Sequence, residues 1–182
     1  WKPLKAYCDA QGIIFFSTPM SRGAAERLAH VGVPLWKIGS GDILDFPAMD
    51  FMRNTAIPII ISSGMSTLEE VEQGLHFLRA KNNRVALMHA LSKYPGEPEE
   101  ANLGTMELYR ERFPGVPIGF SENSIGIEPS LLAVAMGATM IEKHFTMRRD
   151  AWGADHKVSS TPAEFKEMVT RIRALEADPL AR

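Results

Sequence analysis

The sequence IPIIISSGMSTLEEVEQGLHFL, at residues 57–78, contains the repeating unit from which the fold can be predicted. Residues 57–62 are almost continuously apolar, which is typical of a parallel strand that is covered on both faces. From Leu68 onward the apolar residues recur at helical spacing, and Thr67 followed by Glu70 is a capping-box pattern at a helix start. A strand that leads directly into an amphipathic helix is one βα unit.

Apolar runs of this kind alternate with amphipathic segments along the whole chain. The runs cover residues 13–17, 35–38, 57–62, 85–89, 117–121 and 140–145. Successive runs begin 22 to 32 residues apart, which leaves room for a turn, a helix and a return to the sheet. Residues 1–11 also have helical spacing, and Thr161-Pro162 is typical of the first turn of a last helix. The sequence therefore predicts six βα units and an α/β fold.

Six parallel strands can belong to an open doubly wound sheet or to an eight-stranded TIM (β/α)8 barrel. A doubly wound sheet usually has a glycine-rich phosphate turn after its first strand, and Ser17-Thr18-Pro19 is not such a turn. Polar residues instead follow every predicted strand, which favours a barrel with one site at the strand ends. A complete barrel needs about 250 residues and eight units. We therefore expect six of the eight units here and two more on the N-terminal side.

The composition argues against several classes of function. Of the 182 residues 45% are hydrophobic and 23% charged, and the net charge of -2 gives no reason to expect nucleic acid or an anionic membrane as partner. The lone cysteine, Cys8, cannot form an internal disulfide and is typical of a reducing cytoplasm. No apolar run approaches the ~20 residues that span a bilayer. We expect a cytoplasmic protein that acts on small molecules.

Hydroxyl groups and a lysine recur where the predicted strands end. These residues are Thr18, Lys37, Ser40, Ser62 and Ser121. Serine and glycine at one such place could simply shape a turn, but their recurrence favours a site for an anion such as phosphate. The string Ser62-Ser63-Gly64 also precedes a helix, whose first backbone N–H groups attract anions.

Lys37 and two further residues, His144 and Asp155, are candidates for chemistry. Lys37 lies in an otherwise apolar strand, where a lysine is costly unless it is paired. It could bind phosphate or form a Schiff base, and the accompanying hydroxyls favour phosphate. His144, at the end of the last strand, could be a metal ligand or a hydrogen-bonded core histidine. Asp155, in the loop beyond, is a candidate acid or base.

In order and spacing, the short motifs of the chain resemble those of the N-acetylneuraminate (sialic acid) synthase family along essentially its whole length. The matching strings are FSTP at 16–19, KIGSG at 37–41, IISSGM at 60–65, YP at 94–95, GFS at 119–121, GI at 126–127, IEKHFT at 141–146 and GADH at 153–156. The family includes legionaminate and pseudaminate synthases and spore-coat polysaccharide proteins. The resemblance implies a transferase that joins phosphoenolpyruvate to an N-acylmannosamine-type sugar, giving a nonulosonic acid and phosphate.

The resemblance also implies roles for individual positions. Those that match the phosphoenolpyruvate-binding residues of the family are Thr18, Lys37, Ser40, Ser62 and Ser121. Tyr94 and Asp155 match positions that contact the sugar, and Ser92 stands where the family has an asparagine. His144 matches one of two histidines that bind a divalent metal, usually Mn²⁺, with Mg²⁺ as the alternative.

Three positions depart from the family pattern. The second metal histidine corresponds to Asn123, whose carbonyl oxygen binds hard cations but is a weaker ligand than imidazole for a transition metal. A family glutamate corresponds to the shorter Asp42, and the asparagine to Ser92. Asp42 and Asp155 are the candidate catalytic carboxylates. The departures leave open a catalytically silent sugar-phosphate-binding barrel, and Lys37 leaves open a Schiff-base aldolase.

The family resemblance implies a barrel followed by a small C-terminal antifreeze-like domain, usually in a domain-swapped homodimer. Residues 1–182 correspond to a portion of the barrel, without its first two βα units and without the antifreeze-like domain. We therefore expect the natural protein to extend beyond this chain. Its expected partners are phosphoenolpyruvate and an amino sugar.

Overall fold

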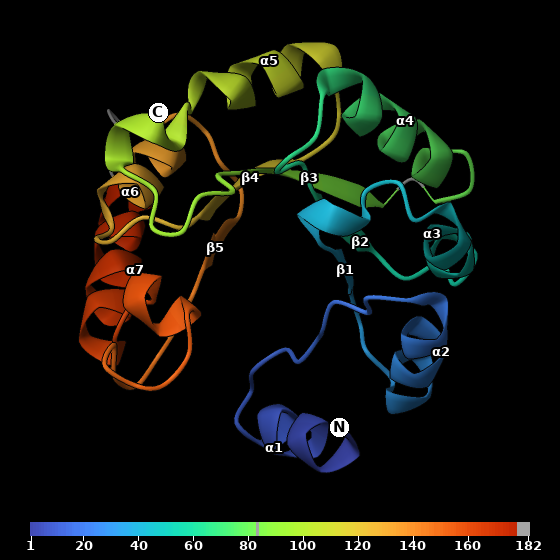
Figure 1. Ribbon diagram of the computed structural model, residues 1–182, viewed down its shortest axis with the longest axis horizontal. Coiled ribbons are helices and arrows are strands. Elements are labelled where there is room, and N and C mark those ends of the chain that lie inside the picture. The colour runs from blue at the N-terminus through green and yellow to red at the C-terminus, as the bar shows by residue number, and fades with distance from the viewer. Residues whose placement is uncertain (83, 178–182) are drawn as a thin grey trace. The chain divides into compact units, whose positions relative to one another are not determined.

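The computed structural model describes residues 1–82 and 84–177, in which helices alternate with strands along the chain (Figure 1). The elements, with short 3₁₀ helices labelled η, are α1 (Lys2–Ala10), α2 (Arg22–Val31), β1 (Trp36–Ile38), η1 (Ser40–Asp42), α3 (Phe46–Arg53), β2 (Ile59–Ser62), α4 (Leu68–Arg79), β3 (Val85–Ala90), η2 (Pro98–Ala101), α5 (Gly104–Arg112), β4 (Ile118–Glu122), α6 (Glu128–Ala135), β5 (Ile141–Lys143), η3 (Asp155–Val158) and α7 (Pro162–Ala177).

The strands follow their sequence order in the sheet, β1-β2-β3-β4-β5. β1 pairs with β2 in parallel, with Lys37 beside Ile60, and β4 pairs with β5 in parallel, with Ser121 beside Glu142. A doubly wound sheet reverses its strand order at a switch point, whereas the strands of a β/α barrel follow one another in sequence. The observed order confirms the α/β prediction and agrees with the barrel class.

The first predicted strand, residues 13–17, does not form a strand. Ser17 makes one isolated parallel bridge to Trp36, whereas Ile13 and Ile14 are 62% and 70% exposed. The run is apolar enough for a strand, but among the described residues no strand pairs with its other edge, so a ladder does not extend along it. The structure therefore shows five of the six predicted strands, and the count of six βα units is not confirmed.

Residues Trp1–Leu87 form one compact unit, here unit 1. Helices α2, α3 and α4 contact one another in sequence. Their apolar faces and the strands supply the buried core, whose largest members are Trp36, Ile38, Met49, Ile59, Ile61, Val71, Leu78 and Leu87. The capping box predicted at α4 is present, because Thr67 Oγ1 accepts from the Glu70 N–H and the Glu70 carboxylate accepts from the Thr67 N–H.

The second compact unit, here unit 2, begins at Met88, within β3. Helices α5 and α6 contact β4, and α6 contacts α7. Ile127, Leu131 and Met168 form a buried apolar cluster in this unit. In the described part of the chain, none of the helices combines the length and apolar character that crossing a bilayer requires.

Candidate functional site

Lys37 of β1 is 7% exposed and lies between two buried apolar residues, Trp36 and Ile38. Because side chains alternate along a strand, Lys37 points to the opposite side from these two neighbours. Its partner across the sheet is Ile60, and Ser62 lies two residues further on the same face of β2. Lys37 Nζ donates a hydrogen bond of 2.7 Å to Ser62 Oγ. The structure thus brings together two of the predicted anion-binding residues.

Ser40 lies in η1, directly after β1, and contacts the loop that follows β2. Its Oγ accepts a hydrogen bond of 3.0 Å from the backbone N–H of Gly64. Ser66 Oγ in turn donates to the Gly64 carbonyl over 3.2 Å. A serine hydroxyl that accepts one bond can still donate its own hydrogen. Ser40 therefore holds the second loop in place while it keeps a donor for a ligand.

Thr18 and Asp42 both lie close to Gly39, which separates β1 from η1. A Cβ atom on Gly39 would lie 3.4 Å from Asp42 Oδ2 and 3.7 Å from Thr18 Cγ2. Partial burial, with a smaller contribution from the neighbouring Asp45 carboxylate, raises the pKa of Asp42 above its ordinary value. Asp42 is therefore easier to protonate than a solvated aspartate, which suits a group that exchanges protons.

Unit 2 contains a cavity of about 140 Å³ at the ends of β4 and β5. It is lined by Tyr94, Ser121, Glu122, Asn123, Glu142, Lys143 and His144. Four of the predicted site residues, Tyr94, Ser121, Asn123 and His144, therefore share one cavity. Ser92 lies in the exposed loop after β3 and is not among the lining residues.

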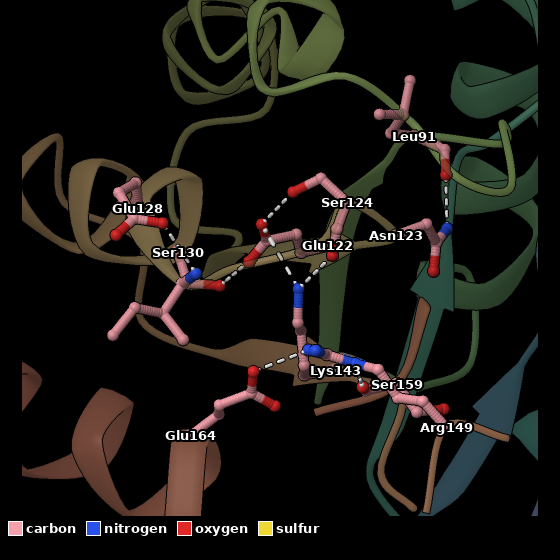
Figure 2. Close-up of polar contacts among 11 residues, drawn as sticks. Leu91, Glu122, Asn123, Ser124, Glu128, Ser130, Lys143, Arg149, Ser159 and Glu164 are labelled. Atoms are coloured by element: carbon pink, nitrogen blue, oxygen red, sulfur yellow. Dashed lines mark hydrogen bonds and ion pairs between the residues drawn. The ribbon is translucent and has the colours of Figure 1, made fainter. Parts of the chain in front are cut away.

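The cavity has a defined pattern of contacts. Ser121 Oγ donates a hydrogen bond of 2.8 Å to Glu142 Oε1, across the strand pair. The rings of Tyr94 and His144 meet edge to face, with their centroids 5.5 Å apart. Asn123 Nδ2 donates a hydrogen bond to the Leu91 carbonyl, and Figure 2 shows the amide oxygen of Asn123 pointing away from Leu91. The Asn123 amide is therefore held in one orientation.

Asp155 interacts electrostatically with Tyr94. Burial, together with the charges of Asp155 and Glu142, raises the pKa of the Tyr94 hydroxyl, and a hydrogen bond with Asn123 opposes this shift. Asp155 is the first residue of η3, and Ser159 Oγ donates a hydrogen bond of 2.7 Å to the Asp155 carbonyl. Tyr94 therefore stays a neutral donor near a carboxylate, a combination that can bind sugar hydroxyls.

Three cavity residues, Glu122, Glu142 and Lys143, were not predicted from the sequence as site residues, and two of them form a buried ion pair. Lys143 Nζ lies 3.4 Å from Glu122 Oε1, and both side chains are 1% exposed. Burial lowers the pKa of Lys143, while the Glu122 carboxylate acts in the opposite direction. The sequence did contain a signal for them, because a charged residue inside a strand covered on both faces needs a partner. It did not reveal which partner.

Donors of the right chemistry for a divalent ion lie in the cavity. His144 offers an imidazole, Asn123 an amide oxygen, and Glu142 a carboxylate that already accepts from Ser121. These donor types fit Mn²⁺ or Mg²⁺. Across residues 1–82 and 84–177, however, no three His, Cys, Asp or Glu side chains gather closely enough to hold a metal. The described residues therefore offer donor atoms of a suitable type, without a closed group of carboxylate or imidazole ligands.

Comparison with known proteins gives a consistent result. The profile of the NeuB family matches residues 1–178. N-acetylneuraminate-9-phosphate synthase from Mus musculus is 36% identical over 97% of this chain and 49% of its own length. N,N'-diacetyllegionaminic acid synthase from Campylobacter jejuni is 36% identical over 96% of this chain and 53% of its own length. The chain spans about half the length of these curated relatives.

The fold is similar to that of a solved structure from the same group of relatives. The spore coat polysaccharide biosynthesis protein spsE from Bacillus subtilis superposes with a TM-score of 0.91 at 37% identity. The match covers 96% of this chain and 49% of the spsE chain. The described elements therefore agree with an established parallel α/β structure.

Proposed function

This chain belongs to the NeuB family, as its motifs predict, and from that premise we propose that the protein containing it condenses phosphoenolpyruvate with an N-acylmannosamine-type sugar. The products are a nonulosonic acid and inorganic phosphate. Relatives named as synthases support this reaction type. The observation that carries the proposal is the 2.7 Å contact between Lys37 Nζ and Ser62 Oγ, because a buried cation beside hydroxyls is suited to a phosphate group.

In this proposal, unit 1 binds phosphoenolpyruvate. Lys37 supplies the positive charge. Ser40 and Ser62 supply hydroxyl donors at the ends of β1 and β2, and Thr18 supplies a third from the segment that precedes α2. The backbone after β2, held by Ser40 through Gly64, adds N–H groups ahead of α4. Assigning Ser121 to the same substrate rests on the family resemblance alone.

The sugar is assigned to residues of unit 2. Tyr94 and Asp155 offer a hydroxyl donor and a carboxylate acceptor, and Ser92 adds a hydroxyl from the loop after β3. His144 and Asn123 would hold a Mn²⁺ or Mg²⁺ ion. When bound, such an ion acts as a Lewis acid on the carbonyl group of the open-chain sugar.

The proposed reaction forms one carbon–carbon bond. C3 of phosphoenolpyruvate attacks the aldehyde carbon of the sugar, and cationic character develops at C2. Water adds at C2 and loses one proton, and the C2–O bond to the phosphate then breaks as the C2 ketone forms, with the second water proton passing to the departing phosphate. We assign the proton that water loses to the carboxylate of Asp42, which lies in η1 with Ser40. The oxygen of the former aldehyde takes up a proton from solvent, which the Asp155 carboxylate relays. Lys37 and the hydroxyls contribute by positioning and by charge stabilisation.

The direct test is phosphate release from phosphoenolpyruvate by the full-length protein with Mn²⁺ and a panel of N-acylated amino sugars. We expect release that depends on both the sugar and phosphoenolpyruvate. No release across a broad panel would remove the synthase proposal. Borohydride trapping with pyruvate separates the Schiff-base aldolase, because only that enzyme would become covalently labelled at Lys37.

One observation favours a second candidate, a catalytically silent sugar-phosphate-binding barrel. Asn123 stands at a metal position of the family, and its amide nitrogen is engaged with the Leu91 carbonyl. A silent barrel would bind phosphoenolpyruvate or a sugar phosphate tightly without turnover. Isothermal titration of the full-length protein, run beside the phosphate assay, distinguishes the two candidates.

The setting of the reaction is also part of the proposal. The single cysteine of the chain suits a reducing cytoplasm, where we expect the enzyme to act. The family resemblance further predicts a homodimer of the full-length protein. Light scattering of that protein at micromolar concentration tests the dimer, and a monomer would contradict it.

A further inference from the structure

A buried polar network forms part of the wall of the cavity in unit 2. Lys143 Nζ is 3.4 Å from Glu122 Oε1 and donates a hydrogen bond of 2.6 Å to the Ser124 carbonyl. The hydroxyls of Ser124 and Ser130 donate to the two oxygens of the Glu122 carboxylate. Figure 2 shows Lys143 pointing to Glu122, with Ser124 and Ser130 on either side of the carboxylate. The network therefore joins β4, β5 and α6.

The pair is in register with the cavity. Glu122 is the partner of Lys143 across the strands, and Ser121 is the partner of Glu142 one step earlier. Asn123 directly follows Glu122, and His144 directly follows Lys143. Because side chains alternate along a strand, a slip of one residue between β4 and β5 would turn Asn123 or His144 away from its present side. The ion pair opposes such a slip at the point where both strands end.

Stability alone gives a weak reason for this pair. Removing two charges from water is costly, and a well-packed apolar pair of similar size is often as stable or more stable. The network spares the protein an unpaired buried charge, since each carboxylate oxygen and the ammonium group has partners. An ion pair has one advantage over an apolar pair. Its hydrogen bonds are directional, so they form in only one arrangement of the ends of β4 and β5.

We propose that Glu122 and Lys143 are positioning residues, which hold Asn123 and His144 in a fixed relation across the ends of β4 and β5. This inference rests on the proposed function in one respect, namely that Asn123 and His144 serve the synthase reaction. Neither member of the pair is a catalytic residue in this account. The pair acts through its neighbours, which line the cavity with Tyr94 and Ser121.

The test uses the full-length protein and the double variant Glu122→Gln/Lys143→Met. Gln at 122 can still bond Ser124 and Ser130, whereas the link to β5 is removed together with both charges. We expect an unfolding midpoint within about 3 °C of the wild type, because no unpaired charge stays buried. We expect kcat to fall about 10²-fold, the effect of a misplacement near 1 Å.

A second readout does not depend on turnover. In protein with ¹³C-labelled histidine, the ring resonance of His144, assigned with the variant His144→Gln, should move in the double variant. The single variant Lys143→Met, which leaves the Glu122 carboxylate without its cation, should instead lower the unfolding midpoint by roughly 10 °C. Glu122→Asp keeps the charge pair and should keep most of the turnover.

A matched control removes an ion pair that lies elsewhere in unit 2. Glu167 and Arg171 of α7 are 3.7 Å apart and more than half exposed, so Glu167→Gln/Arg171→Met should change neither kcat nor the His144 resonance. Wild-type turnover and an unmoved His144 resonance in the Glu122/Lys143 double variant would overturn the inference. If the wild type itself releases no phosphate, the proposed function fails, and the His144 resonance alone decides whether the pair positions that ring.

Discussion

Ser40 Oγ accepts a hydrogen bond of 3.0 Å from the backbone N–H of Gly64, so the loop after β1 supports the loop after β2. Beside this link, Lys37 Nζ donates to Ser62 Oγ, which joins the same two strands through their side chains. Two βα units thus present their polar ends as one connected group. If this group binds a phosphate, removal of the Lys37 cation should reduce the binding free energy more than removal of one hydroxyl.

The first prediction concerns Lys37. In Lys37→Met the apparent KM for phosphoenolpyruvate should rise about 10- to 100-fold, since a hydrogen bond to a charged group contributes about 1.5–3 kcal/mol. Ser62→Ala, which leaves the cation in place, should raise it only about fivefold. Steady-state kinetics at a saturating sugar concentration measures both effects. Equal effects of the two substitutions would contradict the assignment of the charge to the phosphate.

The second prediction concerns Asp42 and the dependence of stability on pH. Burial and Asp45 raise the pKa of Asp42 in the folded protein, so ionisation of this group disfavours folding. The stability that the protonated Asp42 carboxyl contributes is therefore present at low pH, and it is lost as the pH rises through the folded-state pKa. Asp42→Asn should therefore be more stable than the wild type at about pH 7, and the difference should vanish below about pH 3.

Urea unfolding at the two pH values measures this difference. The same substitution should lower turnover about 10²-fold or more, because the amide cannot exchange a proton. Asp45→Asn serves as a comparison for stability: it removes the neighbouring charge and should lower the pKa of Asp42, while it keeps the Asp42 carboxyl. A variant Asp42→Asn that turns over at the wild-type rate would exclude Asp42 from the proton transfers.

The sequence predicts those elements of the fold whose formation depends on residues close to one another in the chain. Continuous apolar runs predicted β1 to β5 within about two residues, because burial on both faces leaves a local pattern. The capping box of α4 was also predicted, since Thr67 and Glu70 are three residues apart. The run at 13–17 has the same local pattern but lacks strand geometry, because a strand also needs neighbours that its own residues do not encode.

The site divides in the same way. Lys37 could be singled out because a lysine in an apolar strand is costly by itself. The contact of Ser40 with Gly64 and the pairing of Glu122 with Lys143 join residues 24 and 21 positions apart. Such contacts depend on loop conformation and on strand register, which local patterns do not determine. The sequence therefore predicted residue types at strand ends, and the structure revealed how these residues support one another.

The third prediction concerns metal binding at Asn123. In Asn123→His an imidazole replaces an amide oxygen, and the affinity for Mn²⁺ should rise roughly tenfold or more. Substitution of residues that only contact the metal ligands already changes metal affinity about 10- to 100-fold. Electron paramagnetic resonance of free Mn²⁺ during a titration measures the affinity. Asn123→Leu, which offers no donor, is the matched control and should bind less tightly than the wild type. If all three proteins bind Mn²⁺ equally, position 123 is not a ligand.

The fourth prediction concerns the loop that carries Asp155. Arg149 connects this loop to α7. Its Nε donates a hydrogen bond of 3.0 Å to the Ser159 carbonyl, and its Nη2 donates one of 2.7 Å to Glu164 Oε1. Arg149→Ala should lower the free energy of unfolding by about 1–2 kcal/mol. Because the loop then holds Asp155 less firmly, the KM for the sugar should rise more than the KM for phosphoenolpyruvate.

The neighbouring Arg148 provides a matched control for this prediction. It pairs with Asp150 over 2.9 Å, but both side chains are more than 70% exposed, and such pairs contribute little to stability. Arg148→Ala should therefore change the free energy of unfolding by less than about 0.5 kcal/mol and leave both KM values unchanged. Chemical unfolding and kinetics with each substrate varied in turn separate the two variants. If Arg149→Ala raised both KM values equally, the loop would not act on the sugar alone, and the assignment of Asp155 to the sugar would be wrong.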